Sequence, residues 1–243
     1  MSRKPLKYVA QISHVREVSL RGAADSAFWK NKLEHENLIL AETDGQAQIL
    51  ITAADAKYMG MRFREVSFSI LTSGYKGVEI AGAYLLQAFN SNLFFAFCER
   101  TLFSTPYSHA DVRVSCRPVF VKCTTTREVI FHADMHADYS APSREPVRCG
   151  VDGWEGPVFL PGGKGRGRDG KFFIAKITGD TRVYPFLPNE DSLLLSRSQG
   201  SDVIQALIDS GFACKEWAVR EDATHAKSKT YASVEALTEL AWN

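Results

Sequence analysis

Four side chains able to bind a metal alternate along one short stretch: His132, Asp134, His136 and Asp138. Successive side chains of a β-strand point to opposite faces, so all four would share one side. Imidazole and carboxylate groups are ordinary metal ligands, which makes a metal site one interpretation. Positions two residues apart are, however, roughly 6.5 to 7 Å apart along a strand, so one ion would need a bend or a second strand. A solvated outer face is the favoured interpretation, and we expect no metal.

The segment 162–171, GGKGRGRDGK, combines glycine with basic residues. It has neither the glycine spacing of the dinucleotide-binding fingerprint nor the P-loop pattern, so we expect no nucleotide cofactor. Its charges would suit an anionic ligand or non-specific contact with RNA. Asp169-Gly170 is a turn signal, which favours a flexible hairpin or lid.

Glu65 and Tyr107 are candidates for acid–base chemistry. Glu65 lies on an apolar-rich, strand-like segment, where it either points inward as an acid or base or pairs with Arg62 or Arg64 on the outside. Tyr107 follows a proline, and its hydroxyl either donates to a substrate carbonyl or carboxylate or packs at a turn. His109 nearby is either a general acid or base or an exposed loop histidine.

The overall charge excludes some classes of partner. The 243 residues include 29 Lys and Arg against 28 Asp and Glu, and 45% of the residues are hydrophobic. This balance argues against a protein specialised for nucleic acid or an anionic membrane. No apolar run approaches the length of a signal-peptide core or a membrane helix. The five cysteines form no C-x-x-C pair and are interpreted as reduced thiols, so we expect a cytoplasmic protein.

Strand patterns dominate the elements that must position these residues. A short helix is predicted from Asp25 or Ser26 to Leu33, and others over 201–210 and 233–241. A loop is predicted over 74–82, a helical turn or loop over 99–110, and a long connection over 140–170. The predicted strands are 6–20, a hairpin over 38–53, 63–71, 83–90, 93–98, 112–122, 128–137, 172–177, 181–186 and 192–195. This pattern predicts one mainly β (α+β) domain over 1–243, an antiparallel barrel or sandwich with peripheral helices.

The motif order between Met61 and Val114 is distinctive. FREVSFSI is followed by a glycine-containing loop, GAYLLQAFNSN, an apolar segment and FCERTLFSTPYSHADV. This order resembles the acetoacetate decarboxylase superfamily, which has a strand with a glutamate, a G-x-Y strand, an apolar strand ending in G-R-E, and a Pro-Lys-Lys turn. The resemblance implies a closed antiparallel β-barrel with an internal pocket, flanking helices and frequent homo-oligomers.

The resemblance also implies site residues. Glu65 matches the glutamate, and Arg100 matches the arginine of G-R-E, although Glu99 stands where glycine is usual. Tyr107 occupies the position of the lysine that forms a Schiff base with a β-keto acid in that family. A phenol cannot form an iminium, so Schiff-base chemistry is unavailable at this position. A substitute lysine would have to come from elsewhere, with Lys76, Lys122 and Lys164 as candidates.

We therefore expect a protein that binds a small organic acid or keto compound in a barrel pocket, without Schiff-base chemistry. Lyase activity and non-catalytic binding or sensing remain the two alternatives. In this hypothesis Glu65 handles a proton or orients the ligand, Tyr107 is a neutral donor, and Arg100 holds a carboxylate or braces Glu65. The predicted binding residues are Arg64, Arg100, Thr105 and His109. We expect a homo-oligomer with no cofactor, no nucleic acid and no membrane partner.

Overall fold

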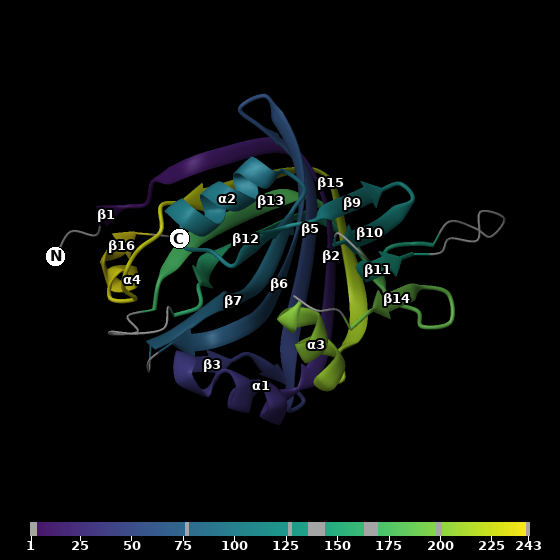
Figure 1. The fold of residues 1–243 in the computed structure, drawn as a ribbon, viewed down its shortest axis with the longest axis horizontal. Coiled ribbons are helices and arrows are strands. Elements are labelled where there is room, and N and C mark those ends of the chain that lie inside the picture. The colour runs from purple at the N-terminus through teal and green to yellow at the C-terminus, as the bar shows by residue number, and fades with distance from the viewer. Residues whose placement is uncertain are drawn as a thin grey trace.

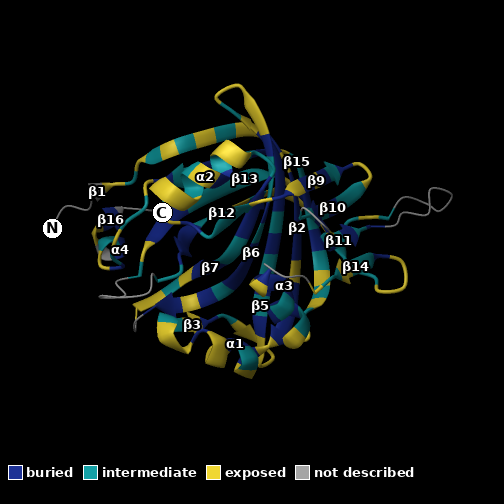
Figure 2. Cartoon of the chain, in the orientation of Figure 1, coloured by how far each residue is buried: buried dark blue, intermediate teal, exposed yellow. Residues whose placement is uncertain are grey.

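Long, curved strands build most of the molecule (Figure 1). The computed structural model describes residues 4–75, 78–125, 128–135, 144–162, 170–197 and 201–241. Figure 2 shows that the central strands are buried along much of their length, while the exposed residues gather on helices and hairpin ends.

The main strands close into a ring. Their order is β6, β5, β2, β15, β13, β12 and β7, and β7 pairs back with β6. Neighbours in this ring are antiparallel except β12 and β7, which pair in parallel through Val158–Ala83 and Phe159–Tyr84. The predicted closed, mainly antiparallel barrel is confirmed, with one parallel junction. The ring strands are β2 (Tyr8–Asp25), β5 (Gln46–Tyr58), β6 (Met61–Tyr75), β7 (Val78–Asn90), β12 (Arg148–Phe159), β13 (Phe172–Pro185) and β15 (Ala213–Ser228).

Shorter strands extend the ring or form separate sheets. A four-stranded sheet, β14-β11-β10-β9, lies at the right of Figure 1. It comprises β9 (Asp111–Cys116), β10 (Val119–Thr124), β11 (Val129–Asp134) and β14 (Ser192–Leu195). The remaining strands are β3 (Leu38–Leu40) beside β6, β4 (Glu42–Thr43) beside β5, β8 (Tyr107–His109) parallel to β7, and β1 (Lys4–Pro5) paired with β16 (Leu240–Ala241).

Two of the predicted helices have clear counterparts. α1 (Ser26–Lys32) begins after Asp25, whose side chain accepts a hydrogen bond of 2.7 Å from the Phe28 N–H, as its predicted cap requires. α3 (Asp202–Asp209) lies within the predicted 201–210. The predicted helix over 233–241 is shorter in the structure, where α4 (Ala236–Glu239) is followed by β16. The remaining helices are a 3-10 turn (Glu34–Glu36) and α2 (Leu93–Leu102). No helix among the described residues is long and apolar enough to cross a membrane.

Three predictions of local structure are wrong. The apolar segment 93–98 belongs to helix α2 and not to a strand, because the Asn92 side chain accepts hydrogen bonds from the Phe94 and Phe95 N–H groups and caps the helix. The predicted loop 74–82 is largely occupied by the ends of β6 and β7. The predicted connection 140–170 contains the strand β12.

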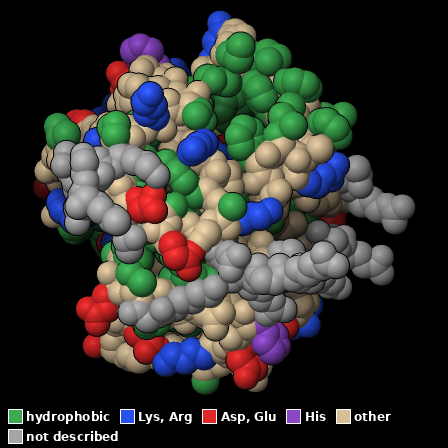
Figure 3. All heavy atoms as spheres, turned by 90° about the vertical axis from the view of Figure 1, so that its left-hand side faces the viewer, with side chains coloured by type: hydrophobic (Ala, Val, Ile, Leu, Met, Phe, Trp, Pro, Cys, Tyr) green, Lys and Arg blue, Asp and Glu red, His purple; other side chains and the backbone are tan. Residues whose placement is uncertain are grey.

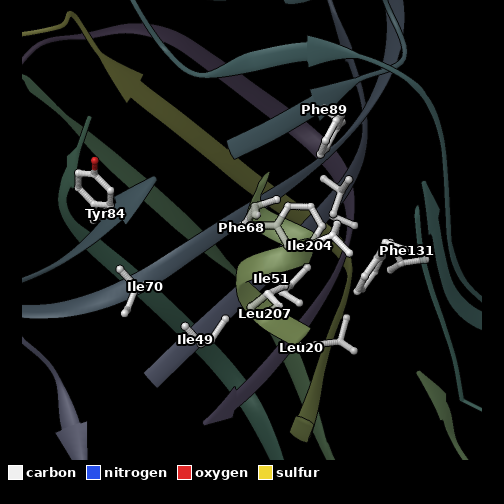
Figure 4. Close-up of a cluster of buried hydrophobic side chains, with 14 of the residues drawn as sticks. Leu20, Ile49, Ile51, Phe68, Ile70, Tyr84, Phe89, Phe131, Ile204 and Leu207 are labelled. Atoms are coloured by element: carbon white, nitrogen blue, oxygen red, sulfur yellow. The ribbon is translucent and has the colours of Figure 1, made fainter. Parts of the chain in front are cut away.

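The two faces of β6 have different surroundings. Phe68 and Ile70 on one face belong to the large core shared with α3 and the four-stranded sheet (Figure 4). Phe63 and Glu65 lie on the opposite face. The Phe63 ring contacts Phe95 of α2 edge to face, with centroids 5.2 Å apart, so α2 covers this second face. Glu65 is therefore on the side of the ring that α2 closes.

Candidate functional site

Polar side chains from separate strands converge beneath α2. They are Glu65 on β6, Asn90 on β7, Tyr107 on β8, Lys227 on β15 and Glu99 on α2 itself. We call these five residues the interior cluster. β5 and β2 separate β6 from β15 in the ring, so Glu65 and Lys227 approach the cluster from different parts of the ring wall.

Glu65 is held by two donors. Its Oε2 accepts from the Tyr107 hydroxyl at 3.2 Å and from the Asn90 amide at 3.3 Å. Burial, reinforced by the charge of Glu99, raises the pKa of Glu65 against the opposing effects of His225, Lys227 and the Tyr107 hydrogen bond. The cluster therefore favours the protonated carboxyl more than water does, which is the property a proton donor needs.

Tyr107 is placed by the parallel pairing of β8 with β7, where it lies opposite Ala88. Its ring packs in a small apolar cluster that includes Phe173 and Val158. Burial, followed by the negative charges of Glu65 and Glu99, raises the pKa of Tyr107 well above its usual value. The phenol therefore stays a neutral hydrogen-bond donor throughout the physiological pH range.

Lys227 supplies the positive charge of the cluster. Its Nζ lies 2.7 Å and 2.6 Å from the two carboxylate oxygens of Glu99. It also lies 4.8 Å from the centroid of the Phe103 ring and 4.5 Å from that of Phe173. The Thr105 hydroxyl donates to the same Glu99 carboxylate at 2.9 Å. The Lys227 Nζ is therefore surrounded by two aromatic rings and a carboxylate, which are groups that stabilise a positive charge.

A second charged network lies behind the cluster. Glu17 is fully buried, accepts from the Ser19 hydroxyl at 3.0 Å, contacts the Arg220 guanidinium, and lies 2.5 Å from Nε2 of His225. Burial alone would raise the pKa of Glu17, but the hydrogen bond and charge of His225, together with Arg220, lower it to about 2. Glu17 is therefore a fixed negative charge that anchors β2 to β15.

Solved structures with the same arrangement of strands are found over most of the chain. An acetoacetate decarboxylase from Legionella pneumophila subsp. pneumophila str. Philadelphia 1 matches with a TM-score of 0.60 at 12% identity, covering 97% of this chain and 91% of that one. An acetoacetate decarboxylase-like enzyme from Sphingomonas wittichii RW1 matches with a TM-score of 0.53 at 11% identity, covering 92% and 93%. The chain has the acetoacetate decarboxylase-like fold.

A further match is the enduracididine biosynthesis enzyme MppR in complex with pyruvate, with a TM-score of 0.57 at 10% identity, covering 91% of this chain and 88% of that one. No protein-family model and no curated protein matches the sequence. At such low identities the acetoacetate decarboxylase-like fold is established by geometry, and the roles of individual side chains must be argued from their surroundings.

Within this acetoacetate decarboxylase-like fold, the structure brings together some of the predicted site residues. Glu65 and Tyr107 share a hydrogen bond, and buried Thr105 contacts Glu99 beside them. The alternative pairing of Glu65 with Arg62 or Arg64 is wrong among the described contacts, because both arginines bind Asp55 instead.

Arg64, Arg100 and His109 lie elsewhere. Arg100 and His109 are exposed and line a surface pocket of about 400 Å³ with apolar residues of α2. Arg100 follows Glu99 on the helix, so the two side chains point in different directions, and Arg100 does not brace Glu65. Arg64 binds Asp55 with Nε 3.3 Å from its carboxylate.

The lysine in the cluster is none of those proposed from the sequence. Lys122 lies on β10 in the four-stranded sheet, and Lys76 and Lys164 lie outside the described residues. No strand is predicted over 213–228, although His225 and Lys227 have the spacing of two residues on one face of a strand. That alternation is the sequence signal that could have directed attention to Lys227.

The metal and loop hypotheses have separate outcomes. On β11 and at the residue after it the predicted alternation is present, with Ala133 and Met135 buried and His132 and Asp134 partly exposed. His136 and Asp138 lie outside the described residues, as do residues 163–169 of the glycine-rich segment. The described ranges contain no group of three or more His, Cys, Asp or Glu side chains that could hold a metal.

Proposed function

We propose that the protein binds a small organic acid, in particular a keto acid, inside the ring at the interior cluster. Lys227 holds the carboxylate, the neutral Tyr107 hydroxyl donates to the carbonyl, and Glu65 handles a proton. The acetoacetate decarboxylase-like fold supports this proposal, as does the pyruvate complex of MppR, which shares the fold.

The Lys227–Glu99 ion pair is the observation that carries the proposal. Both side chains are only 21% exposed. A charge removed from water needs a partner, and without one its burial is strongly unfavourable. Glu99 supplies that partner from α2, so a carboxylate group already lies against the ammonium. A substrate carboxylate that replaces Glu99 exchanges one ion pair for another, which requires much less free energy than creating a buried pair anew.

The same groups are arranged for decarboxylation without an iminium. When a β-keto acid loses carbon dioxide, the electron pair of the broken C–C bond moves into an enolate. The Tyr107 hydroxyl donates to the enolate oxygen, and protonated Glu65 transfers its proton to the carbon, giving the ketone. Lys227 forms no covalent bond with the substrate in this sequence of steps.

A comparison of acetoacetate with its neutral methyl ester tests whether binding depends on the carboxylate of the ligand. We expect acetoacetate to bind in isothermal titration calorimetry and the ester to bind at least about tenfold more weakly, a difference of roughly 1.4 kcal/mol. Equal binding of the two would contradict a cation-directed site. Release of carbon dioxide above the uncatalysed rate indicates a lyase, whereas binding without turnover indicates the alternative, a non-catalytic binding or sensing protein.

We propose in addition that the chain self-associates through α2. Figure 3 shows hydrophobic side chains gathered on part of the surface, and the exposed apolar residues of α2 are Leu93, Phe94, Phe97 and Leu102. Exposed apolar patches are typical of interaction surfaces. Light scattering coupled to size-exclusion chromatography should give a molar mass that is a multiple of 27.0 kDa, and the Phe94→Asp variant should have a lower molar mass.

All five cysteines are free thiols, which supports the proposed cytoplasmic location.

A further inference from the structure

A second pocket lies outside the interior cluster. It has a volume of about 420 Å³ and is bounded by α1, α3, β7 and the segment 105–108. We call it the outer pocket, and we propose that it binds a small organic anion, a carboxylate or a phosphate ester with an apolar body. This site goes beyond the proposed function, because its charged side chains, Lys32, Arg100 and Asp202, are not part of the interior cluster.

Two cations without ion pairs carry the proposal. Lys32 at the end of α1 and Arg100 on α2 both line the outer pocket, and both are exposed. Neither forms an ion pair within the described ranges of the chain, whereas Lys30, which is also on α1 but does not line the pocket, binds Glu42 at 2.8 Å. Two cations on one concave surface raise the local potential and favour an anion there.

Neutral donors and apolar walls complete the outer pocket. Trp29 lines it and is fully buried, and its indole N–H has no hydrogen-bond acceptor in the part of the chain that is described. A buried donor without a partner is unfavourable by about 1 to 3 kcal/mol, so a ligand oxygen that reached this group would relieve that penalty. Gln87 and Ser108 add polar groups, and the apolar lining residues are Leu86, Pro106, Val203 and Ala206.

One acidic residue also lines the outer pocket. Asp202 is in the first turn of α3, where a carboxylate is favourable beside the helix N-terminus. Its presence leaves an excess of one positive charge from Lys32 and Arg100. An anionic ligand with an apolar body therefore matches both the charge and the walls of the pocket.

The outer pocket and the interior cluster share one short segment of the chain. Glu99 pairs with Lys227 in the cluster, while the next residue, Arg100, lines the outer pocket. Consecutive helical residues point about 100° apart, which accounts for this division. Thr105 and Tyr107 likewise line the outer pocket while their hydroxyls bond to Glu99 and Glu65. The two sites can therefore be separated by mutation of different side chains.

Three matched probes test the proposal: 4-methylpentanoate, 3-methylbutyl phosphate and neutral 4-methylpentanamide. We expect at least one anion to bind and the amide to bind about tenfold more weakly. Lys32→Ala and Arg100→Ala should each weaken anion binding about fivefold, in line with charge-assisted contacts. Lys30→Ala is the control on the same helix and should leave the affinity unchanged. Tighter binding of the carboxylate identifies an organic acid as the ligand class, and tighter binding of the phosphate identifies a phosphate ester.

Binding to Lys227→Met distinguishes this site from the interior cluster. The outer-pocket proposal expects the anion to bind this variant as it binds the wild-type protein, whatever happens to acetoacetate. The proposal is overturned if no probe binds, if the amide binds as tightly as the anions, or if Lys30→Ala weakens binding as much as Lys32→Ala. Loss of binding in Lys227→Met alone would likewise overturn it, by assigning the anion to the interior.

Discussion

Glu99 holds Lys227 by both carboxylate oxygens, at 2.6 Å and 2.7 Å, inside a ring of strands that α2 closes. The two residues are 128 positions apart in the sequence. Their pairing gives the interior cluster a cation, although Tyr107 stands at the position that the sequence resemblance assigns to the lysine of the decarboxylases.

The ion pair predicts that Glu99 competes with ligand. Glu99→Gln keeps a group that can accept from Thr105 but removes the negative charge from Lys227. We expect the affinity for acetoacetate to increase about tenfold, since binding no longer has to displace a charged partner. Calorimetric titration measures the change, and Glu155→Gln, which removes the partner of exposed Lys176, is the control. Unchanged or weaker binding in Glu99→Gln would argue against the exchange of carboxylates.

Glu65 predicts a dependence of stability on pH. Folding raises its pKa above the ordinary value of 4.5, so the folded state holds the proton more tightly than the unfolded state. Its contribution to stability is therefore fully present below pH 4.5 and is lost as the pH rises through the raised pKa. Glu65→Gln should flatten this part of the profile and gain stability relative to wild type as the pH increases from 4.5 towards neutrality.

Urea unfolding at a series of pH values measures this effect. Glu155 is the matched comparison. Burial raises its pKa, but the hydrogen bond and charge of Lys176 outweigh that effect, so the pKa of Glu155 is lowered. Glu155→Gln should therefore change the profile in the opposite direction. A Glu65→Gln variant whose pH profile runs parallel to that of the wild-type protein would show that the carboxyl does not change its proton affinity on folding.

Glu17 predicts sensitivity to acid. Because its folded-state pKa is lowered to about 2 from 4.5, its stabilising contribution is present above pH 4.5 and is lost as the pH falls towards 2. Arg220→Met leaves this buried carboxylate with one cation fewer and should destabilise the protein by about 3 kcal/mol. Arg113→Met removes an exposed ion pair with Asp111 and should change stability by less than about 0.5 kcal/mol. Equal effects of the two substitutions in urea unfolding would refute the structural role of the Glu17 network.

The ion pair of Lys227 with Glu99 predicts the result of chemical trapping. Attack on a ketone needs an amine whose electron pair is free, and the Lys227 Nζ is held against both carboxylate oxygens of Glu99. Incubation with acetoacetate and borohydride should therefore leave no covalent adduct on this residue. Intact-mass and peptide mass spectrometry provide the measurement. An adduct on Lys227 would show that the residue acts as the nucleophile that Tyr107 cannot be.

Local sequence patterns predict much of the ring but not the whole site. Alternating apolar residues identify strands such as 63–71, and Asp25 identifies the start of α1. The segment 93–98 has the composition of a buried strand, yet it is a helix, because the cap provided by Asn92 outweighs that composition and several of its apolar side chains remain exposed.

The candidate site is likewise predictable from local sequence patterns only in part. Glu65 and Tyr107 were identifiable because each stands at a recognisable position of a motif in the sequence. Lys227 and Glu99 were not, because nothing local links a lysine on one strand to a glutamate on a helix far earlier in the chain. Only ring closure, which brings β15 beneath α2, creates the pair. The position of the Arg100 side chain likewise depends on the face of α2 to which the residue belongs, and a motif match does not specify that face.

The most direct test of the central claim is calorimetric titration of acetoacetate into wild-type protein, Lys227→Met and Lys176→Met. Lys176 is the matched control, since it lies on β13 and pairs with Glu155 at 2.8 Å but is 44% exposed. The account predicts that binding is lost in Lys227→Met and retained in Lys176→Met. Undiminished binding of acetoacetate to Lys227→Met would contradict it.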